Sequence, residues 1–147
     1  MLFLKRSGGQ AQFSTQLQAQ FSSVPAIQQV QLWCLDNLAD DLHVTTLARR
    51  AAMSERGFIR AFRDDTGRTP GEFVMSARLQ AACRLLAESE IALKEVAQRC
   101  GLGTAATMRR LFMQRLGVSP AHYRDKFHVH EVLAERMQLE ESHSPAR

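Results

Sequence analysis

One pattern of apolar and polar positions, about thirty residues long, occurs twice in the chain, at residues 47–73 and 96–123. With 100° per residue, Phe58 and Phe62 fall on one face of a helix over about 54–66. The opposite face carries one apolar residue and three arginines (Arg56, Ile59, Arg60, Arg63). A second helix over about 104–116 repeats this division between an apolar face, which we expect to be buried, and an outward face (Ala106, Arg109, Arg110, Met113).

The two copies match position by position when the first is shifted by 50 residues. Four positions are then identical (Arg60/Arg110, Phe62/Phe112, Gly67/Gly117, Pro70/Pro120). Four more carry close replacements (Ser54/Thr104, Phe58/Met108, Thr69/Ser119, Phe73/Tyr123). Upstream of Ser54 the shift becomes 49, which leaves Gly103 as an extra residue. The pattern indicates an internal duplication, so the fold is predicted from the repeated unit.

Each copy is predicted to be a short helix, a tight turn and a longer helix. Ser54 is placed to cap the first long helix, and Gly67 and Gly117 follow the two long helices, where a chain often leaves in a left-handed conformation. The segment 69–72 then has the composition of a capping box with proline at the first helical position, and Ser119 and the proline after it repeat this start. This order of elements is that of a helix-turn-helix.

Two further helices are predicted besides the four of the repeats and the one that starts at Ser119. One begins at Pro25, with Ser22 or Ser23 as candidate caps, and covers the first helix-turn-helix. The other joins the two copies over about 70–87, and eighteen residues at 1.5 Å each span about 27 Å. That length is close to the roughly 34 Å between successive major grooves on one face of DNA. We therefore expect an all-α fold of about seven helices, with two helix-turn-helix subdomains joined by a long central helix.

The remaining segments differ in composition from the repeats. Residues 1–23 are rich in glutamine, serine and glycine, and we expect a linker that is partly disordered. Residues 24–128 form the predicted double helix-turn-helix domain. Residues 129–147 are expected to extend a final helix and then fray.

The charge on the outward faces indicates the kind of partner. Residues 49–63 contain five arginines and one acid, and residues 99–124 contain five arginines and no acid. Arginine suits phosphate and the O6/N7 edge of guanine. A solvated basic surface is the alternative, but it does not explain why arginine recurs at one register in both copies. The net charge of +4 and the pI near 9.4 agree with a polyanionic partner without identifying it.

Other classes of function find little support. No apolar run approaches the length of a membrane span, and the three cysteines are typical of reduced core residues in a cytosolic protein. His128 and His130 lack cysteines or acids at ligand spacing, and no phosphate loop or catalytic motif is present. We expect no enzymatic activity, no cofactor and no metal, and a cytoplasmic location.

The two repeats and the helix between them resemble the DNA-binding domain of the AraC/XylS family of bacterial transcriptional regulators, over about residues 27–127. The second copy carries its most specific features (Ala97, Gly101, Arg110, Phe112, Gly117, Ser119, Pro120, Tyr123, Arg124). The runs 101–110 and 6–14 resemble the GlxA-like branch. Members of that branch carry an amidotransferase-like, PfpI-type domain ahead of this segment, and none fits here. The resemblance thus implies a fragment or a stand-alone reader whose effector or dimerisation domain is missing.

The resemblance places the base-reading positions on the outward faces already described. They are Arg56, Ile59 and Arg60 in the first long helix, followed in the second by a corresponding set (Ala106, Thr107, Arg109, Arg110). The helix caps Ser54 and Thr104, together with Arg63, complete the candidate DNA-binding residues. Arg78, where the family commonly has arginine, is expected to hold the central helix against a subdomain.

The sequence therefore predicts a transcription regulator that binds specific double-stranded DNA with helices 54–66 and 104–116, placed in successive major grooves. RNA polymerase is a further candidate partner. The alternative is a protein-interaction module, or a regulator fragment, that binds DNA without sequence preference. Rising salt weakens the DNA binding of both kinds of protein. A specific regulator still binds its own site more tightly than other sequences, whereas the alternative binds all sequences alike and only through salt-sensitive contacts.

Overall fold

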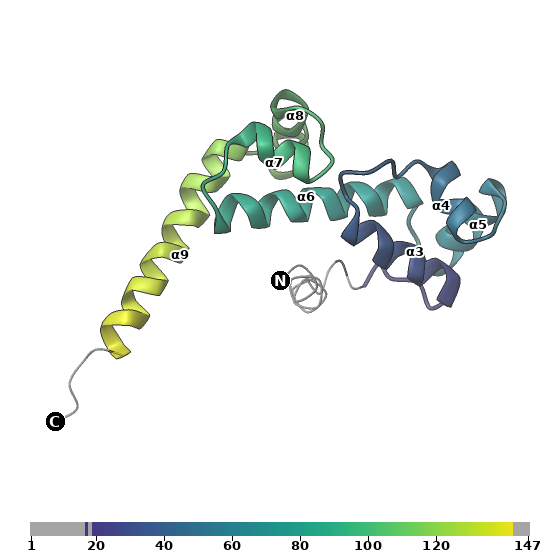
Figure 1. The fold of residues 1–147 in the computed structure, drawn as a ribbon, viewed down its shortest axis with the longest axis horizontal. Coiled ribbons are helices and arrows are strands. Elements are labelled where there is room, and N and C mark those ends of the chain that lie inside the picture. Colours follow the sequence, from purple (N-terminus) through teal and green to yellow (C-terminus); the bar gives the residue numbers. More distant parts are fainter. Residues whose placement is uncertain (1–16, 18, 143–147) are drawn as a thin grey trace. The chain divides into compact units, whose positions relative to one another are not determined.

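The chain is described by a computed structural model that covers residue 17 and residues 19–142. These residues contain helices and no strand, which confirms the predicted all-α fold (Figure 1). The helices, in chain order, are α3 (Pro25–Asp36), α4 (Val44–Arg50), α5 (Glu55–Thr66), α6 (Pro70–Glu88), α7 (Leu93–Arg99), α8 (Ala105–Leu116) and α9 (Pro120–Ser142).

The chain divides into two compact units, and the boundary between Arg78 and Leu79 falls inside α6. The first unit holds one helix-turn-helix, made by α4 and α5, together with α3 and the first part of α6. The second unit holds the other, made by α7 and α8, together with the rest of α6 and α9. The duplicated sequence therefore gives one helix-turn-helix in each unit, as predicted.

The core of the first unit is built on phenylalanine. Phe62 of α5 lies between Phe58 and Phe73, with ring centroids 5.8 and 5.9 Å away. All three rings are at most 1% exposed. Aliphatic side chains from α3, α4 and the loop between them complete this core (Ile27, Val30, Leu42, Leu47). Figure 1 shows α4 and α5 next to each other, as a helix-turn-helix requires.

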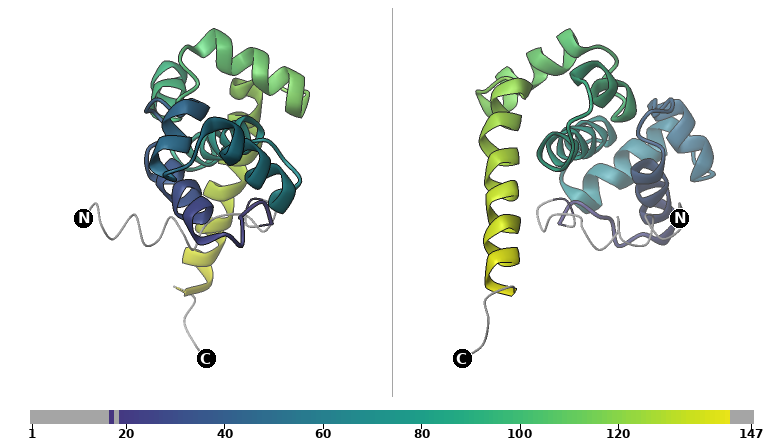
Figure 2. Two further views of the ribbon diagram at one scale, coloured as in Figure 1. Left: turned by 90° about the vertical axis from the view of Figure 1, so that its right-hand side faces the viewer. Right: turned by 60° about the vertical axis from the view of Figure 1, so that its left-hand side comes forward.

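The second unit repeats the arrangement with replacements at matching positions. Met108 and Phe112 of α8 are fully buried, as Phe58 and Phe62 are in the first unit. The ring of Tyr123, on α9, packs edge-on against Phe112 with centroids 5.9 Å apart. The two views in Figure 2 show that a short loop connects α8 to α9. Tyr123 therefore takes the place that Phe73 has in the first copy.

The predicted helix ends are confirmed in both copies. Gly67 and Gly117 follow α5 and α8 with φ of 76° and 73°, the left-handed conformation that favours glycine. At the start of α6, the Thr69 hydroxyl accepts from the Glu72 N–H at 3.1 Å, and the Glu72 carboxylate accepts from the Thr69 N–H at 3.0 Å. Ser119 accepts from a first-turn N–H of α9 at 3.1 Å.

The turn within each helix-turn-helix also requires a left-handed residue. In the second copy this is Gly101, with φ of 77°, as expected for a residue without a Cβ. In the first copy the matching residue is Ala52, with φ of 57°. An alanine in this conformation is sterically strained, and surrounding contacts such as the hydrogen bond from Met53 N–H to the Ala48 carbonyl, at 2.9 Å, hold the turn in place.

Arg78 holds α6 against the first unit, as the sequence predicts. Its guanidinium donates to the carbonyls of Leu38 and Asp40, both at 3.0 Å, just beyond the C-terminal end of α3. In the second unit, Arg124 and His128 of α9 contact the carbonyls of Leu86 and Ala87 near the end of α6, at 3.2 and 2.8 Å. Arg124 and His128 thereby contact carbonyls in the last turn of α6, where the helix itself supplies no partner.

One expectation for the N-terminal part needs correction. The cap of α3 is Val24, and no side chain caps this helix, so Ser22 and Ser23 are not its caps. Leu17, Gln20 and Ser22, which lie in the predicted linker, are buried. The remainder of the predicted linker, residues 1–16 and 18, lies outside the described residues.

The C-terminal part contains a long helix, because α9 runs to Ser142 without a break at residue 128. The predicted fraying over 143–147 lies outside the described residues, and the predicted domain limits stay predictions. Among the described helices, none combines the length and apolar character that a membrane crossing requires.

The glycine after α5 gives the first testable prediction. Replacement Gly67→Ala should lower the free energy of unfolding by about 1 kcal/mol, because a Cβ is strained at this φ although no atom lies within 4 Å of it. Chemical unfolding followed by circular dichroism measures this change. Gly71→Ala is the matched control, since Gly71 lies in the first turn of α6 and its Cβ would make only an ordinary contact. Equal stability losses in the two variants would contradict the assignment of strain to Gly67.

Candidate nucleic-acid interface

Helix α5 presents its basic face because its apolar face is fixed in the core. Phe58 and Phe62 are buried, so the residues on the other side of the helix turn outward. Arg56, Arg60 and Arg63 are exposed, and Ile59 is half-buried among them. Together with Asp64, these four side chains line a hollow of about 540 Å³. The structure thus brings together the candidate residues that the sequence assigned to this helix.

Helix α8 presents the matching face of the second unit. With Met108 and Phe112 buried, Ala106, Arg109 and Arg110 are exposed on the other side. A hollow of about 770 Å³ runs beside them, between α8 and the starts of α7 and α9 (Leu93, Ala105, Ala106, Arg109, Arg110, Met113, Ser119, Pro120, Ala121). Its lining includes Ala105 and Ala106, at the positions where α5 has Glu55 and Arg56.

Helices α5 and α8, called the recognition helices below, are capped by the predicted side chains. Ser54 accepts a hydrogen bond from the Gly57 N–H, and Thr104 accepts one from the Thr107 N–H, each at 3.1 Å. The other N–H groups of each first turn remain without partners inside the helix, and such groups favour an anion such as a phosphate. The Thr104 and Thr107 hydroxyls also bond each other at 3.0 Å, which fixes the direction of the Thr107 side chain.

Several arginines of the two basic stretches serve the fold instead. The Arg50 guanidinium stacks 3.9 Å from the Trp33 ring centroid, a cation–π contact that also explains the packing of this tryptophan. Arg99 pairs with Glu95 one turn earlier in α7, at 3.1 Å. Arg124 bonds the Leu86 carbonyl. The sequence could not separate Arg50 and Arg124 from the arginines of the outward faces, because their partners lie on other helices, whereas the spacing of Arg99 and Glu95 is that of an ordinary pair one helical turn apart.

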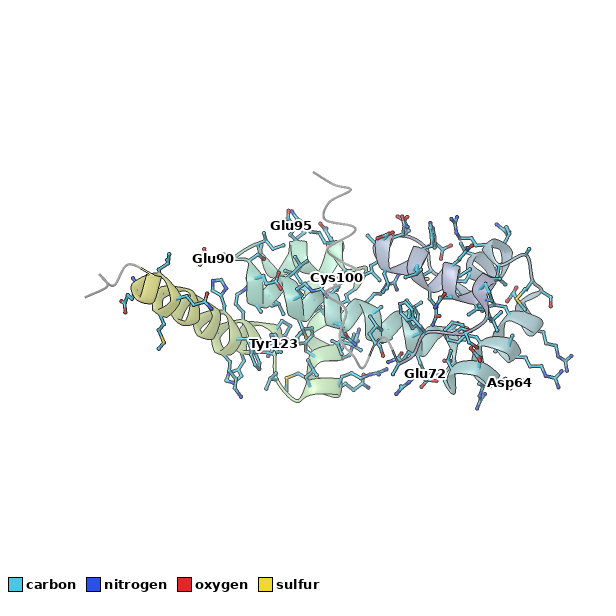
Figure 3. The ribbon with its side chains drawn as sticks, turned by 90° about the horizontal axis from the view of Figure 1, so that it is seen from below. Asp64, Glu72, Glu90, Glu95, Cys100 and Tyr123 are labelled. Carbon is cyan, nitrogen blue, oxygen red and sulfur yellow. The ribbon has the colours of Figure 1, made fainter. Side chains whose placement is uncertain are left out.

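The three acidic residues of α5 have different surroundings. Glu55 lies in the first turn of the helix, where a negative charge is favourable. Asp64, labelled in Figure 3, lines the hollow beside the arginines. Asp65 instead accepts hydrogen bonds from Ser22 and Ser23, which lie before α3. Sequence reasoning missed this contact, for which the only signal is the pair of serines ahead of Pro25.

The cysteines do not form a reactive site. Burial raises the pKa of Cys34 to about 12 and that of Cys100 to about 11. Burial also raises the pKa of Cys83, which shares a hydrogen bond with the Tyr123 hydroxyl. Burial and the neighbouring Cys83 raise the pKa of Tyr123 to about 12. In the described part of the chain, no group of three or more His, Cys, Asp or Glu side chains lies together as a metal site would require.

The family of the chain follows from a comparison with known protein families. A family model described as a helix-turn-helix domain matches residues 47–126, which include both copies of the repeat. The chain belongs to the AraC-type helix-turn-helix family. The predicted resemblance to AraC/XylS regulators is thereby confirmed, while the assignment to the GlxA-like branch stays a prediction.

Individual relatives agree with this family. The HTH-type transcriptional regulator Rv1931c of Mycobacterium tuberculosis is 51% identical over 81 residues, which are 55% of this chain and 31% of that protein. The DNA-binding domain of AdpA, solved in complex with a target DNA, is 40% identical with a TM-score of 0.66, over 69% of this chain and 92% of that domain. The C-terminal domain of AraT, a response regulator from Geobacillus stearothermophilus, shares the fold at 23% identity and a TM-score of 0.66, over 69% and 85%. The chain spans about a third of the length of the curated relatives it matches.

The raised thiol pKa values give a second prediction. The folded protein should resist iodoacetamide near pH 8, because burial disfavours the thiolate, which is the reacting form. A rise in the pKa of Cys100 from 9.0 to about 11 lowers its thiolate fraction about 100-fold at that pH. Mass spectrometry after timed labelling measures the effect, and the same protein in guanidinium, where all three thiols should react readily, is the control. Labelling of Cys34 or Cys100 at the same rate in both conditions would contradict their burial.

Proposed function

We propose that this chain is a transcription regulator that recognises specific double-stranded DNA by placing α5 and α8 in successive major grooves. The main observation for this proposal is that α5 and α8 expose an arginine at the same position of the repeat, Arg60 and Arg110. Both lie on the side of the helix opposite its buried residues. The relatives support this proposal. The domain of AdpA, 40% identical to this chain, is described in complex with a target DNA, and Rv1931c is named as a transcriptional regulator.

Helix α5 has the chemistry to discriminate between bases. Arg56 and Arg60 are one turn apart on its exposed face, and an arginine fork can donate two hydrogen bonds to the O6 and N7 of guanine. Ile59 lies between them and can make only an apolar contact, for which the thymine methyl is a suitable partner. Arg63 is assigned to a phosphate, and the capped start of the helix at Ser54 to another.

Helix α8 is expected to discriminate less and to depend more on the DNA backbone. Ala106 permits close approach but offers no hydrogen bond. The Thr107 hydroxyl accepts a hydrogen bond from Thr104 and keeps one proton that it can donate to a base. Arg109 and Arg110 are the charged side chains left for a base or a phosphate on this face, beside the capped helix start at Thr104. The two motifs thus share a register but differ in the number of groups that can read a base.

The wider biology belongs to the same proposal. The double helix-turn-helix domain is assigned to residues 24–128, and the chain is proposed to act in the cytoplasm without a catalytic step or a cofactor. RNA polymerase is proposed as a protein partner. Effector binding and dimerisation are proposed to lie in a further domain, because the curated relatives are about three times as long as the matched region.

The third prediction tests base reading by α5. Arg60→Ala should weaken binding to the cognate site by about 1–3 kcal/mol and binding to random DNA much less, since a lost base contact affects only the correct sequence. Fluorescence anisotropy with both DNAs at one fixed salt concentration measures the difference.

Arg136→Ala provides the matched control, because it removes one exposed positive charge from α9, which is neither of the two proposed recognition helices. It should change binding to both DNAs equally and slightly. An equal loss on both DNAs for Arg60→Ala would reduce this arginine to a phosphate contact and count against base reading.

A further inference from the structure

We infer that the segment ahead of α3 is part of the DNA-reading unit, and that Asp65 positions recognition helix α5 by binding this segment. The segment consists of residues 19–24 and is named the strap here. The inference rests on the proposed function and deepens it, because it adds a positioning residue that lies outside the base-reading face. It follows from a set of contacts within the first unit.

The carboxylate of Asp65 is the point where the strap meets α5. Its Oδ2 atom accepts hydrogen bonds from the Ser22 hydroxyl at 2.5 Å and from the Ser23 N–H at 2.6 Å. Its Oδ1 atom accepts from the Ser23 hydroxyl at 3.0 Å. Three donors on one carboxylate form a directed contact, and hydrogen bonds to an ionised acceptor are stronger than those between neutral groups.

The strap is anchored on its other side by a buried glutamine of α3. Gln31 is fully buried, with its amide oxygen accepting from the Ser22 N–H at 2.7 Å and its amide nitrogen donating to the Gln20 carbonyl at 2.8 Å. Both polar atoms of this side chain are therefore used to hold backbone groups of the strap. Such a buried, satisfied amide specifies one position for the segment that it binds.

Apolar contacts fix the same segment to the core. The ring of Phe21 packs edge-on against Phe73 with centroids 5.9 Å apart, and Phe73 in turn packs against Phe62 of α5. Leu17, just ahead of the strap, is 2% exposed and belongs to the core of this unit. The strap is thus a packed element that links α3, α5 and the start of α6.

The position of Asp65 on α5 explains what the strap can do. At 100° per residue, Asp65 shares a face with Phe58 and Phe62, whereas Arg56 and Arg63 are on the opposite face. The two phenylalanines hold the first and middle turns, and Asp65 holds the last one. The strap therefore restrains rocking of the helix about its buried residues, which would move the arginines relative to a DNA groove.

The second motif offers a natural contrast. The residue that matches Asp65 in α8 is Arg115, which is exposed and has the opposite charge. A carboxylate contact of this kind is therefore confined to the copy that carries more base-reading groups. This distribution agrees with a role in the accuracy of reading rather than in the stability of a helix-turn-helix in general.

The state of the Asp65 carboxylate suits the contact at neutral pH. The hydrogen bonds from Ser22 and Ser23 lower the pKa of Asp65 below its usual value. For a carboxyl group with a lowered pKa, the stabilising effect is present above the unfolded value and is lost as the pH falls through the folded value. The strap is thus expected to stay bound through the neutral range and to loosen only in acid.

The fourth prediction compares two exposed carboxylates of the first unit, Asp65 and Asp40. Asp65→Asn and Asp40→Asn each remove one negative charge, so both should raise affinity for random DNA. Asp40 lies outside α5, and the contact of its backbone carbonyl with Arg78 is kept in the asparagine variant. Only Asp65→Asn should reduce the ratio of affinities for cognate and random DNA, by about five- to tenfold, because only this change loosens the strap. Anisotropy titrations with the full chain at one salt concentration give both ratios.

A second pair of variants separates the contact from the charge. Ser23→Ala keeps the charge of Asp65 but removes one donor, and it should lower the same ratio by a smaller factor. Ser23→Thr keeps the hydroxyl and should restore it. Thermal unfolding of each variant, and hydrogen exchange of the amides of residues 22–24 and 63–66, show whether the strap alone has loosened or the whole unit has unfolded.

The outcomes separate this inference from the proposed function. Global unfolding lowers affinity for both DNAs equally and leaves the ratio unchanged, so a lower ratio with intact folding supports the positioning role. A wild-type protein that discriminates, combined with equal ratios for Asp65→Asn and Asp40→Asn, overturns the inference alone. A wild-type protein that does not discriminate between the two DNAs overturns the proposed function and the inference with it.

Discussion

The burial of one phenylalanine in each recognition helix is the constraint on which the rest of the structure depends. Phe62 and Phe112 occupy matching positions in the two copies, and each is at most 1% exposed. Because a helix has a fixed period, burying these rings decides which residues face solvent, and Arg60 and Arg110 are two positions away on the exposed side. The packing of the phenylalanines therefore determines by itself that the basic face of each helix is exposed.

Much of the fold was predictable because it depends on interactions between residues close together in the chain. The duplication doubled each signal, so that a cap at Ser54 or a glycine at Gly67 was supported by its counterpart in the other copy. Helix caps, prolines at helix starts and left-handed glycines depend only on residues three or four positions apart, so they can be identified from the sequence. The candidate residues on α5 and α8 were predictable for the same reason, since the period that buries one face exposes the other.

Contacts between residues far apart in the chain were not predictable in the same way. The hydrogen bond from Ser22 to Asp65 joins positions 43 residues apart, and a segment rich in glutamine and serine has the composition of a linker. Its polar side chains find partners only after the unit has folded, among them the buried amide of Gln31. The left-handed Ala52 was not predictable for another reason: alanine disfavours this conformation, so the residue type gives no sign of it.

Selection from a random pool of double-stranded DNA, with this 147-residue chain at near-physiological salt, tests the central claim most directly. Two recognition helices in successive grooves predict an enriched site with two short half-sites about one helical turn apart, the stronger half-site facing α5. Binding that disappears as salt rises, without any enriched sequence, would contradict the account, because the two arginine faces would then hold only the DNA backbone.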